Sequence, residues 1–167
     1  MDAELQALSI AVGIALATQK LTLACAESCT GGWISELVTS TAGSSEWFER
    51  GFVTYSNRAK QEMLGVGEAS LEIHGAVSEE TAREMALGAL AHSHAQIALA
   101  VTGIAGPGGG SSGKPVGTVC FAWCRNEAAA VSETHHFSGD REAVRRQAVI
   151  TSLRGLLSLL GGAKTVP

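Results

Sequence analysis

A short apolar run that ends in a hydroxyl residue and a glycine pair limits the folds open to this chain. Residues 21–26 have the composition of a buried strand, and after Glu27 the chain passes through Ser28 to Gly31 and Gly32, which open an amphipathic segment. This pattern predicts a strand-to-helix corner, at which a serine side chain can stand clear of the backbone. The first N–H groups of a helix have no partner within the helix and stabilise negative charge.

Two interpretations of Ser28 follow from this corner. In the first, Ser28 is a nucleophile, and the amides around Thr30, Gly31 and Gly32 form an oxyanion hole. In the second, Ser28 or Thr30 only caps the helix, as such residues commonly do. The corner alone leaves both interpretations open.

Helical and strand-like patterns alternate along the rest of the chain. Apolar spacing and capping residues predict helices over residues 3–19, 30–39, 59–64 and 78–91, and from residue 140 onward. Short apolar runs predict strands over residues 21–26, 48–54, 97–102, 117–124 and 128–136. Such a pattern packs as helices on both faces of a mostly parallel or mixed sheet. We therefore expect a single three-layer α/β domain over residues 1–167.

The composition excludes several classes of protein. At 167 residues, 46% apolar and 17% charged, the chain has the size and composition of one compact domain. A net charge of −4 argues against a nucleic-acid partner. Residues 3–18 are apolar-rich but interrupted by polar residues and lack a basic leader, so they do not resemble a signal peptide or membrane span. We expect a cytoplasmic protein with no membrane partner.

Cysteine and histidine positions do not suggest a metal site. The cysteines form two pairs with three residues between the members, Cys25 with Cys29 and Cys120 with Cys124. Zinc ligands are usually spaced by two or four residues, and cysteines in a strand-like run are ordinarily core residues. We expect no metal, no cofactor and no disulfide.

A second polar cluster extends from Tyr55 to Lys60. Tyr55 ends a predicted strand, where α/β proteins tend to bind ligands, and Lys60 lies in the first turn of the next helix. A lysine that activates a hydroxyl must be neutral, so burial or nearby positive charge has to lower its pKa from about 10.4. Arg58 and the helix N-terminus are expected sources of that change. The alternative is a solvated surface lysine and an aromatic residue at the strand end.

The third cluster is a glycine- and proline-rich loop over residues 103–115. Its glycines let backbone N–H groups approach an anion closely, although the loop could equally be a flexible connection. It is not a Walker A loop, because Pro115 stands where the magnesium-binding hydroxyl residue belongs and a strand follows. A dinucleotide fold is also disfavoured, because no G-x-G-x-x-G follows the first strand.

Together these segments resemble the CinA C-terminal domain family. The resemblance rests on four segments in register, AESCTGG at 26–32, TYSN at 54–57 with Lys60, GAVS at 75–78 and TGIAGPGG at 102–109. The resemblance extends from about residue 5 to residue 160. Within that family, the chain is similar to the stand-alone nicotinamide-nucleotide amidases. Cys25 stands where many relatives have threonine, which should alter packing behind Ser28 rather than the chemistry.

The resemblance implies a reaction and roles for individual residues. Nicotinamide mononucleotide (NMN) and water would give nicotinate mononucleotide and ammonia, without a metal. Ser28 would be the nucleophile, Lys60 its general base and Tyr55 the third member of the catalytic group. Asn57 and Thr102 fall in the same motifs and are expected to bind substrate.

The substrate's phosphate needs a binding site of its own. We expect the glycine-rich loop to provide it through Gly103, Gly106 and Gly108, with help from an arginine. Arg141 and Arg145 share one face of the last predicted helix, and Arg145 is the candidate for a phosphate or active-site contact. The alternative is that both arginines belong to a solvated charged turn.

Two other functions stay open, a pyridine-nucleotide binding module without catalysis and a serine amidase acting on another small amide. A homodimer is a further expectation, since Leu5 and Leu8 suit a dimer contact as well as they suit the core.

Overall fold

The computed structural model describes residues 2–161, in which five strands form one mixed sheet. The strand order is β2-β1-β3-β4-β5. The strands are β1 (Leu23–Glu27), β2 (Phe48–Val53), β3 (Ile97–Gly103), β4 (Thr118–Arg125) and β5 (Val131–His136). β1 lies parallel to β2 and β3, whereas β4 runs antiparallel to β3 and β5. The carboxyl ends of β1, β2 and β3 therefore meet at one edge of the sheet.

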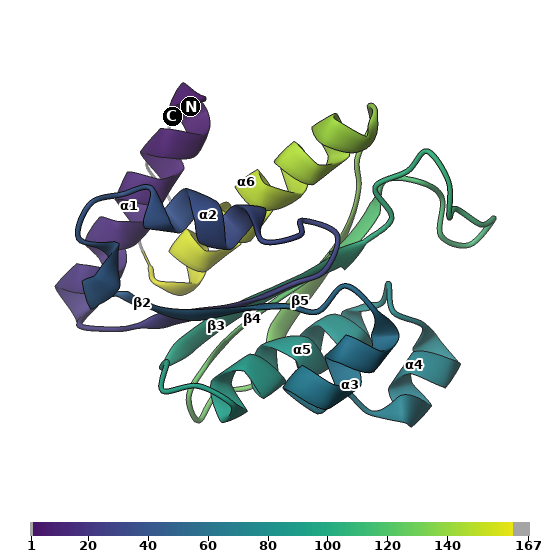
Figure 1. The fold of residues 1–167 in the computed structure, drawn as a ribbon, viewed down its shortest axis with the longest axis horizontal. Coiled ribbons are helices and arrows are strands. Elements are labelled where there is room, and N and C mark those ends of the chain that lie inside the picture. Colours follow the sequence, from purple (N-terminus) through teal and green to yellow (C-terminus); the bar gives the residue numbers. More distant parts are fainter. Residues whose placement is uncertain (1, 162–167) are drawn as a thin grey trace.

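Helices cover both faces of this sheet (Figure 1). One face carries α1 (Ala3–Gln19), α2 (Trp33–Thr39) and α6 (Arg141–Leu159). The other face carries α3 (Asn57–Leu64), α4 (Glu68–His74) and α5 (Glu79–Ala91). A single 3₁₀ turn, η1 (Ser44–Glu46), precedes β2. This arrangement confirms the predicted three-layer α/β fold with a mixed sheet.

The central strands present different side chains to the two helical layers. In β3, Ile97, Leu99 and Val101 belong to the core under α1 and α6, and Ala98 and Ala100 belong to the core under α5. All of them are at most 1% exposed. Because alternate residues of a strand point to opposite faces, the apolar run builds two cores at once. Packing on both faces holds the central strands in place, and with them the carboxyl ends from which the polar residues follow.

Most predicted elements are present, with shifted ends. The helix predicted from residue 30 begins at Trp33, because residues 28–32 form a turn in which Gly31 and Gly32 have φ of +60° and +99°. The helix predicted from residue 59 begins at Asn57, since the Ser56 hydroxyl accepts a hydrogen bond from the Ala59 N–H and caps it. The helix α4 was not predicted, and Leu71 is its only buried residue.

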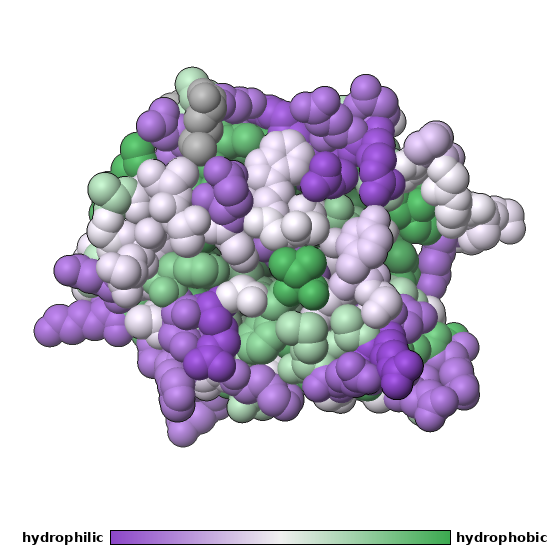
Figure 2. Space-filling view, viewed as in Figure 1, coloured by the Kyte–Doolittle hydropathy of each residue, from purple (hydrophilic) through white to green (hydrophobic). Residues whose placement is uncertain are grey.

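The surface bears on the expected dimer contact. Leu5 and Leu8 are 4% and 1% exposed, so they belong to the core of the protomer. The large apolar residues that α1 does expose are Ile10 and Ile14. Figure 2 shows that the face drawn there carries hydrophobic side chains in its centre with polar ones around them. Among the residues described, no helix is both long and apolar enough to cross a membrane.

Candidate active site

A cavity of about 170 Å³ lies at the carboxyl edge of β1, β2 and β3. This is where open α/β sheets bind their ligands, beside the point at which the strand order reverses. The lining residues come from five separate parts of the chain: Ser28, Cys29, Tyr55, Asn57, Lys60, Ala76, Val77, Thr102, Gly103, Ala105 and Arg141. The structure thus brings together seven of the residues singled out from the sequence: Ser28, Tyr55, Asn57, Lys60, Thr102, Gly103 and Arg141.

Ser28 and Lys60 form the reactive pair of this cavity. The Lys60 Nζ lies 3.0 Å from the Ser28 Oγ and donates a second hydrogen bond of 2.9 Å to the Thr54 carbonyl. Lys60 is only 1% exposed. Burial lowers the pKa of this amine below its usual value of 10.5, because desolvation disfavours the charged form. A lysine with a lowered pKa beside a serine hydroxyl is arranged as a general base beside a nucleophile.

Of the two expected causes of this pKa change, burial and nearby positive charge, burial is the one that acts. Arg58 is exposed, and its guanidinium pairs with Glu62 on the surface of α3. The lowered pKa of Lys60 therefore arises from burial and not from Arg58.

Tyr55 lines the cavity but makes a different contact from the one expected. Its hydroxyl accepts a hydrogen bond of 3.0 Å from Arg141, and the side chain is 62% exposed. Ser28 and Lys60 bond to each other instead, so Tyr55 stands at the mouth of the cavity with Arg141.

Glu27 organises the turn after β1, and the sequence interpretation overlooked it. Its carboxylate is fully buried and accepts four hydrogen bonds of 2.7–2.9 Å, from the Thr30 hydroxyl, the Ile34 N–H, and the N–H and hydroxyl of Ser35. A carboxylate at a helix N-terminus satisfies N–H groups that would otherwise lack partners. The sequence does carry a signal, an acidic residue at the end of a buried run and directly before a helix start.

The backbone of the turn changes the expected set of oxyanion donors. The Gly31 N–H donates to the Ser28 carbonyl at 3.0 Å and is therefore occupied. No acceptor on another residue within 2–161 reaches the N–H groups of Cys29, Thr30 and Gly32. Of the three predicted donors, Thr30 and Gly32 remain available, and Cys29 joins them.

The glycine-rich loop contributes less to the cavity than expected. Gly103 lines it, and the Thr102 hydroxyl donates to the Ala76 carbonyl in its wall. Gly106 contributes only its carbonyl, which accepts a hydrogen bond of 2.8 Å from Arg141. Gly108 is exposed and does not line the cavity, which argues against a direct role for it.

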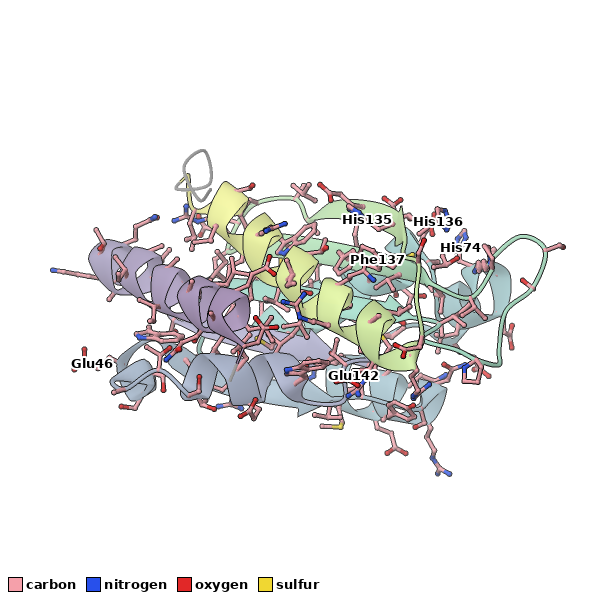
Figure 3. All side chains as sticks on the ribbon, turned by 90° about the horizontal axis from the view of Figure 1, so that it is seen from above. Glu46, His74, His135, His136, Phe137 and Glu142 are labelled. Carbon is pink, nitrogen blue, oxygen red and sulfur yellow. The ribbon has the colours of Figure 1, made fainter. Side chains whose placement is uncertain are left out.

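The two arginines of α6 also differ from expectation. Arg141 enters the cavity wall, whereas Arg145 does not. Arg145 instead donates to the Cys29 and Thr30 carbonyls, each at 3.1 Å, and its guanidinium lies 5.3 Å from the Trp33 ring centroid. Glu142 marks the end of α6 at which both arginines lie (Figure 3). Arg141, rather than Arg145, is thus the arginine placed to meet a ligand in the cavity.

A larger hollow of about 640 Å³ lies on the other side of Val77, with His74 and His136 in its wall. Figure 3 shows these two histidines close together at the end of the molecule that carries the glycine-rich loop. Within residues 2–161, no three His, Cys, Asp or Glu side chains are grouped closely enough to hold a metal ion.

Comparisons with known proteins find relatives over almost the whole length of the chain. The sequence model of the CinA C-terminal domain family matches residues 5–160 of this chain. Nicotinamide-nucleotide amidohydrolase PncC of Escherichia coli (strain K12) is 54% identical over 155 residues, which cover 93% of this chain and 94% of that protein. The protein of the same name from Pseudomonas putida is 56% identical over 134 residues, which cover 80% and 83%.

A solved structure has the same fold throughout. The crystal structure of the competence/damage inducible protein CihA from Agrobacterium tumefaciens matches with a TM-score of 0.93 at 43% identity, covering 95% of this chain and 97% of that one. Since the family model spans almost all of the described residues and relatives exceed 50% identity, this chain belongs to the CinA C-terminal domain family.

Proposed function

We propose that this protein hydrolyses the carboxamide of NMN to nicotinate mononucleotide and ammonia, a step of pyridine-nucleotide salvage, by a metal-free serine mechanism. The observation that carries the proposal is the buried Lys60 amine 3.0 Å from the Ser28 hydroxyl. The names of the relatives that are 54% and 56% identical support the choice of substrate.

The reaction begins with proton transfer from Ser28 to Lys60. The neutral amine takes the hydroxyl proton while the serine oxygen attacks the carboxamide carbon, which gives a tetrahedral oxyanion. The N–H groups of Cys29 and Thr30, which have no acceptor on another residue within 2–161, hold this oxyanion. The cationic pyridinium ring withdraws electrons from the carboxamide and disfavours protonation of Lys60 in the resting complex.

Collapse of the oxyanion breaks the carbon–nitrogen bond. The Lys60 ammonium returns its proton to the departing nitrogen, so ammonia leaves and an ester remains on Ser28. Water then attacks the ester while Lys60 again accepts a proton. Return of that proton to the Ser28 oxygen releases the acid and restores the enzyme. Lys60 performs each transfer, because the Tyr55 hydroxyl is bonded to Arg141.

The size of the cavity divides the substrate into two parts. A volume of about 170 Å³ is below the roughly 300–1,000 Å³ of sites that enclose a whole drug-sized ligand. The pyridine ring and carboxamide therefore occupy it, and the ribose and phosphate extend past its mouth. Arg141 stands there, and a guanidinium matches phosphate oxygens well. Asn57, Thr102 and Gly103 complete the wall around the ring.

Ammonia release from NMN, measured with a metal chelator present, tests the proposal. We expect turnover by the wild type and none above background by Ser28→Ala. Ser158→Ala, an exposed serine of α6, is the control and should match the wild type. If wild type and Ser28→Ala both bind NMN without releasing ammonia, the chain is a binding module and not an amidase. Equal activity on nicotinamide or its riboside would contradict the choice of NMN.

A further inference from the structure

We propose that Arg145 is a positioning residue, which orients the Cys29–Thr30 peptide so that the Thr30 N–H faces the oxyanion. This inference rests on the proposed amidase function. It gives Arg145 a role in the chemical step without any contact with the substrate.

The contacts of Arg145 are directed at backbone carbonyls. Its Nε donates to the Cys29 carbonyl and its Nη2 to the Thr30 carbonyl, both at 3.1 Å. The guanidinium carbon lies over the Trp33 ring, 5.3 Å from its centroid, a favourable cation–π position. Two hydrogen bonds and one cation–π contact hold this group in place. Arg145 is thus held by the turn after Ser28 rather than being free to meet a ligand.

Because the peptide is planar, fixing the Cys29 carbonyl also fixes the direction of the Thr30 N–H. A trans peptide is planar, so its N–H points opposite to its C=O. The only cis peptide within residues 2–161 is Gly106-Pro107, and the Cys29–Thr30 peptide is therefore trans. When Arg145 draws the Cys29 carbonyl toward α6, the Thr30 N–H must point away from α6.

The Thr30 N–H has the properties of a donor kept for a ligand. Thr30 is 0% exposed, and its N–H has no acceptor on another residue within 2–161. Leaving a buried donor without a partner costs free energy, so native structures rarely do so without a functional reason. The neighbouring Gly31 N–H is satisfied by the Ser28 carbonyl, which shows that the turn can pair its amides where no ligand needs them.

Glu27 anchors the opposite side of the same turn. Its carboxylate accepts the Thr30 hydroxyl at 2.7 Å and two N–H groups of α2. Thr30 is therefore held by its side chain from Glu27 and by its carbonyl from Arg145. Rotation of the Thr30 backbone would break bonds on both sides.

A phosphate-binding role for Arg145 makes different kinetic predictions. A positioning residue lowers kcat for every substrate that reacts with Ser28, while a phosphate contact raises KM for NMN alone. We compare NMN with nicotinamide riboside, which lacks the phosphate. For Arg145→Ala we expect kcat/KM to fall by about 10²-fold for both substrates, the usual loss for one oxyanion donor, with KM for NMN unchanged.

Two further variants separate geometry from charge. Arg145→Lys keeps the positive charge but cannot bridge two carbonyls with a planar group, so it should lose nearly as much activity as Arg145→Ala. Added guanidinium ion at millimolar concentration should restore part of the activity of Arg145→Ala and none of that of Arg145→Lys. Arg154→Ala, an exposed arginine of the same helix, is the matched control and should retain wild-type rates.

Pyridine-3-boronic acid reports on the oxyanion hole without turnover. It forms a tetrahedral adduct with a reactive serine, and its affinity should fall in Arg145→Ala by the same factor as kcat. A loss confined to KM for NMN, or unchanged boronate affinity in Arg145→Ala, would overturn the inference. If wild type binds the boronate through Ser28 but releases no ammonia from NMN, the proposed substrate is wrong. The role of Arg145 is then tested by comparing the boronate affinities of the wild type and Arg145→Ala.

Discussion

Two glycine-containing segments follow neighbouring parallel strands, the turn 28–32 after β1 and the loop 104–117 after β3. In the turn, Ser28 and Thr30 are buried, and Glu27, Lys60 and Arg145 each hold part of it by hydrogen bonds. In the loop, residues 107–113 are exposed. A side chain added at Gly108 or Gly113 would meet nothing within 4 Å.

The contrast shows which of two similar sequence signals carries reactive groups. Electrostatic stabilisation of a transition state needs donors that are already in place, because moving them during the reaction costs free energy. The turn meets that requirement because Glu27, Lys60 and Arg145 all hold it. The loop supplies only Ala105 and the Gly106 carbonyl, and Gly103 belongs to the end of β3. The variants below test this difference from the strongest effect to the weakest.

Lys60→Met should show the largest effect on the side of the turn. Methionine fills a similar volume but cannot accept the Ser28 proton, so kcat should fall by about 10²–10⁴-fold. Initial rates of ammonia release measure it. Retention of more than a tenth of the wild-type rate would show that Lys60 is not the base.

Lys60 should also make activity and stability depend on pH. Burial places its folded-state pKa below 10.5, so between the two values the unfolded chain binds more protons than the folded one. The free energy of unfolding should therefore rise with pH across that window relative to Lys60→Met. The rate should rise through the lower pKa as the neutral amine forms. Urea unfolding at a series of pH values, with rates measured in parallel, checks both; a difference between the two proteins that is independent of pH would contradict the assignment.

Glu27→Ala should be the most destabilising change in the turn. It leaves the Ile34 and Ser35 N–H groups and the Thr30 hydroxyl without their buried acceptor, so unfolding should cost at least about 3 kcal/mol less. Chemical denaturation measures this loss. Glu46→Ala removes an exposed glutamate and should change stability by less than about 0.5 kcal/mol. Equal effects of the two changes would remove Glu27 from its role as an anchor.

Arg141→Ala should have an intermediate and selective effect. The guanidinium contacts Tyr55 and the Gly106 carbonyl at the mouth of the cavity, so its loss should raise KM for NMN by about tenfold, equivalent to about 1.4 kcal/mol. KM for nicotinamide riboside should not change. Steady-state kinetics with both substrates measure the difference. An equal rise in KM for both substrates would show that Arg141 does not bind the phosphate.

A pair of alanine substitutions compares Gly103, at the end of β3, with Gly108 in the loop. In Gly103→Ala the new Cβ would lie 2.8 Å from Val119 and 3.0 Å from the Thr118 carbonyl, so stability should fall by about 1–3 kcal/mol. In Gly108→Ala nothing lies within 4 Å, and both activity and stability should stay at wild-type values. A large loss of activity in Gly108→Ala would show that the loop around Gly108 does take part in binding the phosphate.

The sequence predicts the fold better than it predicts individual contacts. Apolar runs define β1 and β3, because strands buried on both faces have to be apolar throughout. The short helix α4 escapes detection, since one buried leucine makes no periodic pattern. A cytoplasmic location and a homodimer stay predictions.

Within the site, residue types predict partners only where those partners are close in sequence or shared by a motif. Ser28, Tyr55 and Lys60 line one cavity as expected. The long-range partners of the turn were not predictable, because Arg145 reaches it from a helix more than a hundred residues further along the chain. Arg141 and Arg145 look equivalent at their spacing, and only their contacts in the fold separate their roles: Arg141 bonds to Tyr55 and the Gly106 carbonyl, whereas Arg145 bonds to the turn and packs over Trp33.

Product partitioning tests the acyl-enzyme at Ser28 most directly. Hydroxylamine competes with water for an ester intermediate, so the ratio of hydroxamate to acid is measured with NMN and with its N-methylamide. A common acyl-enzyme predicts the same ratio from both substrates, because the intermediate no longer contains the leaving group. Different ratios, or turnover that never forms hydroxamate, would contradict a serine ester and with it the proposed roles of Ser28 and Lys60.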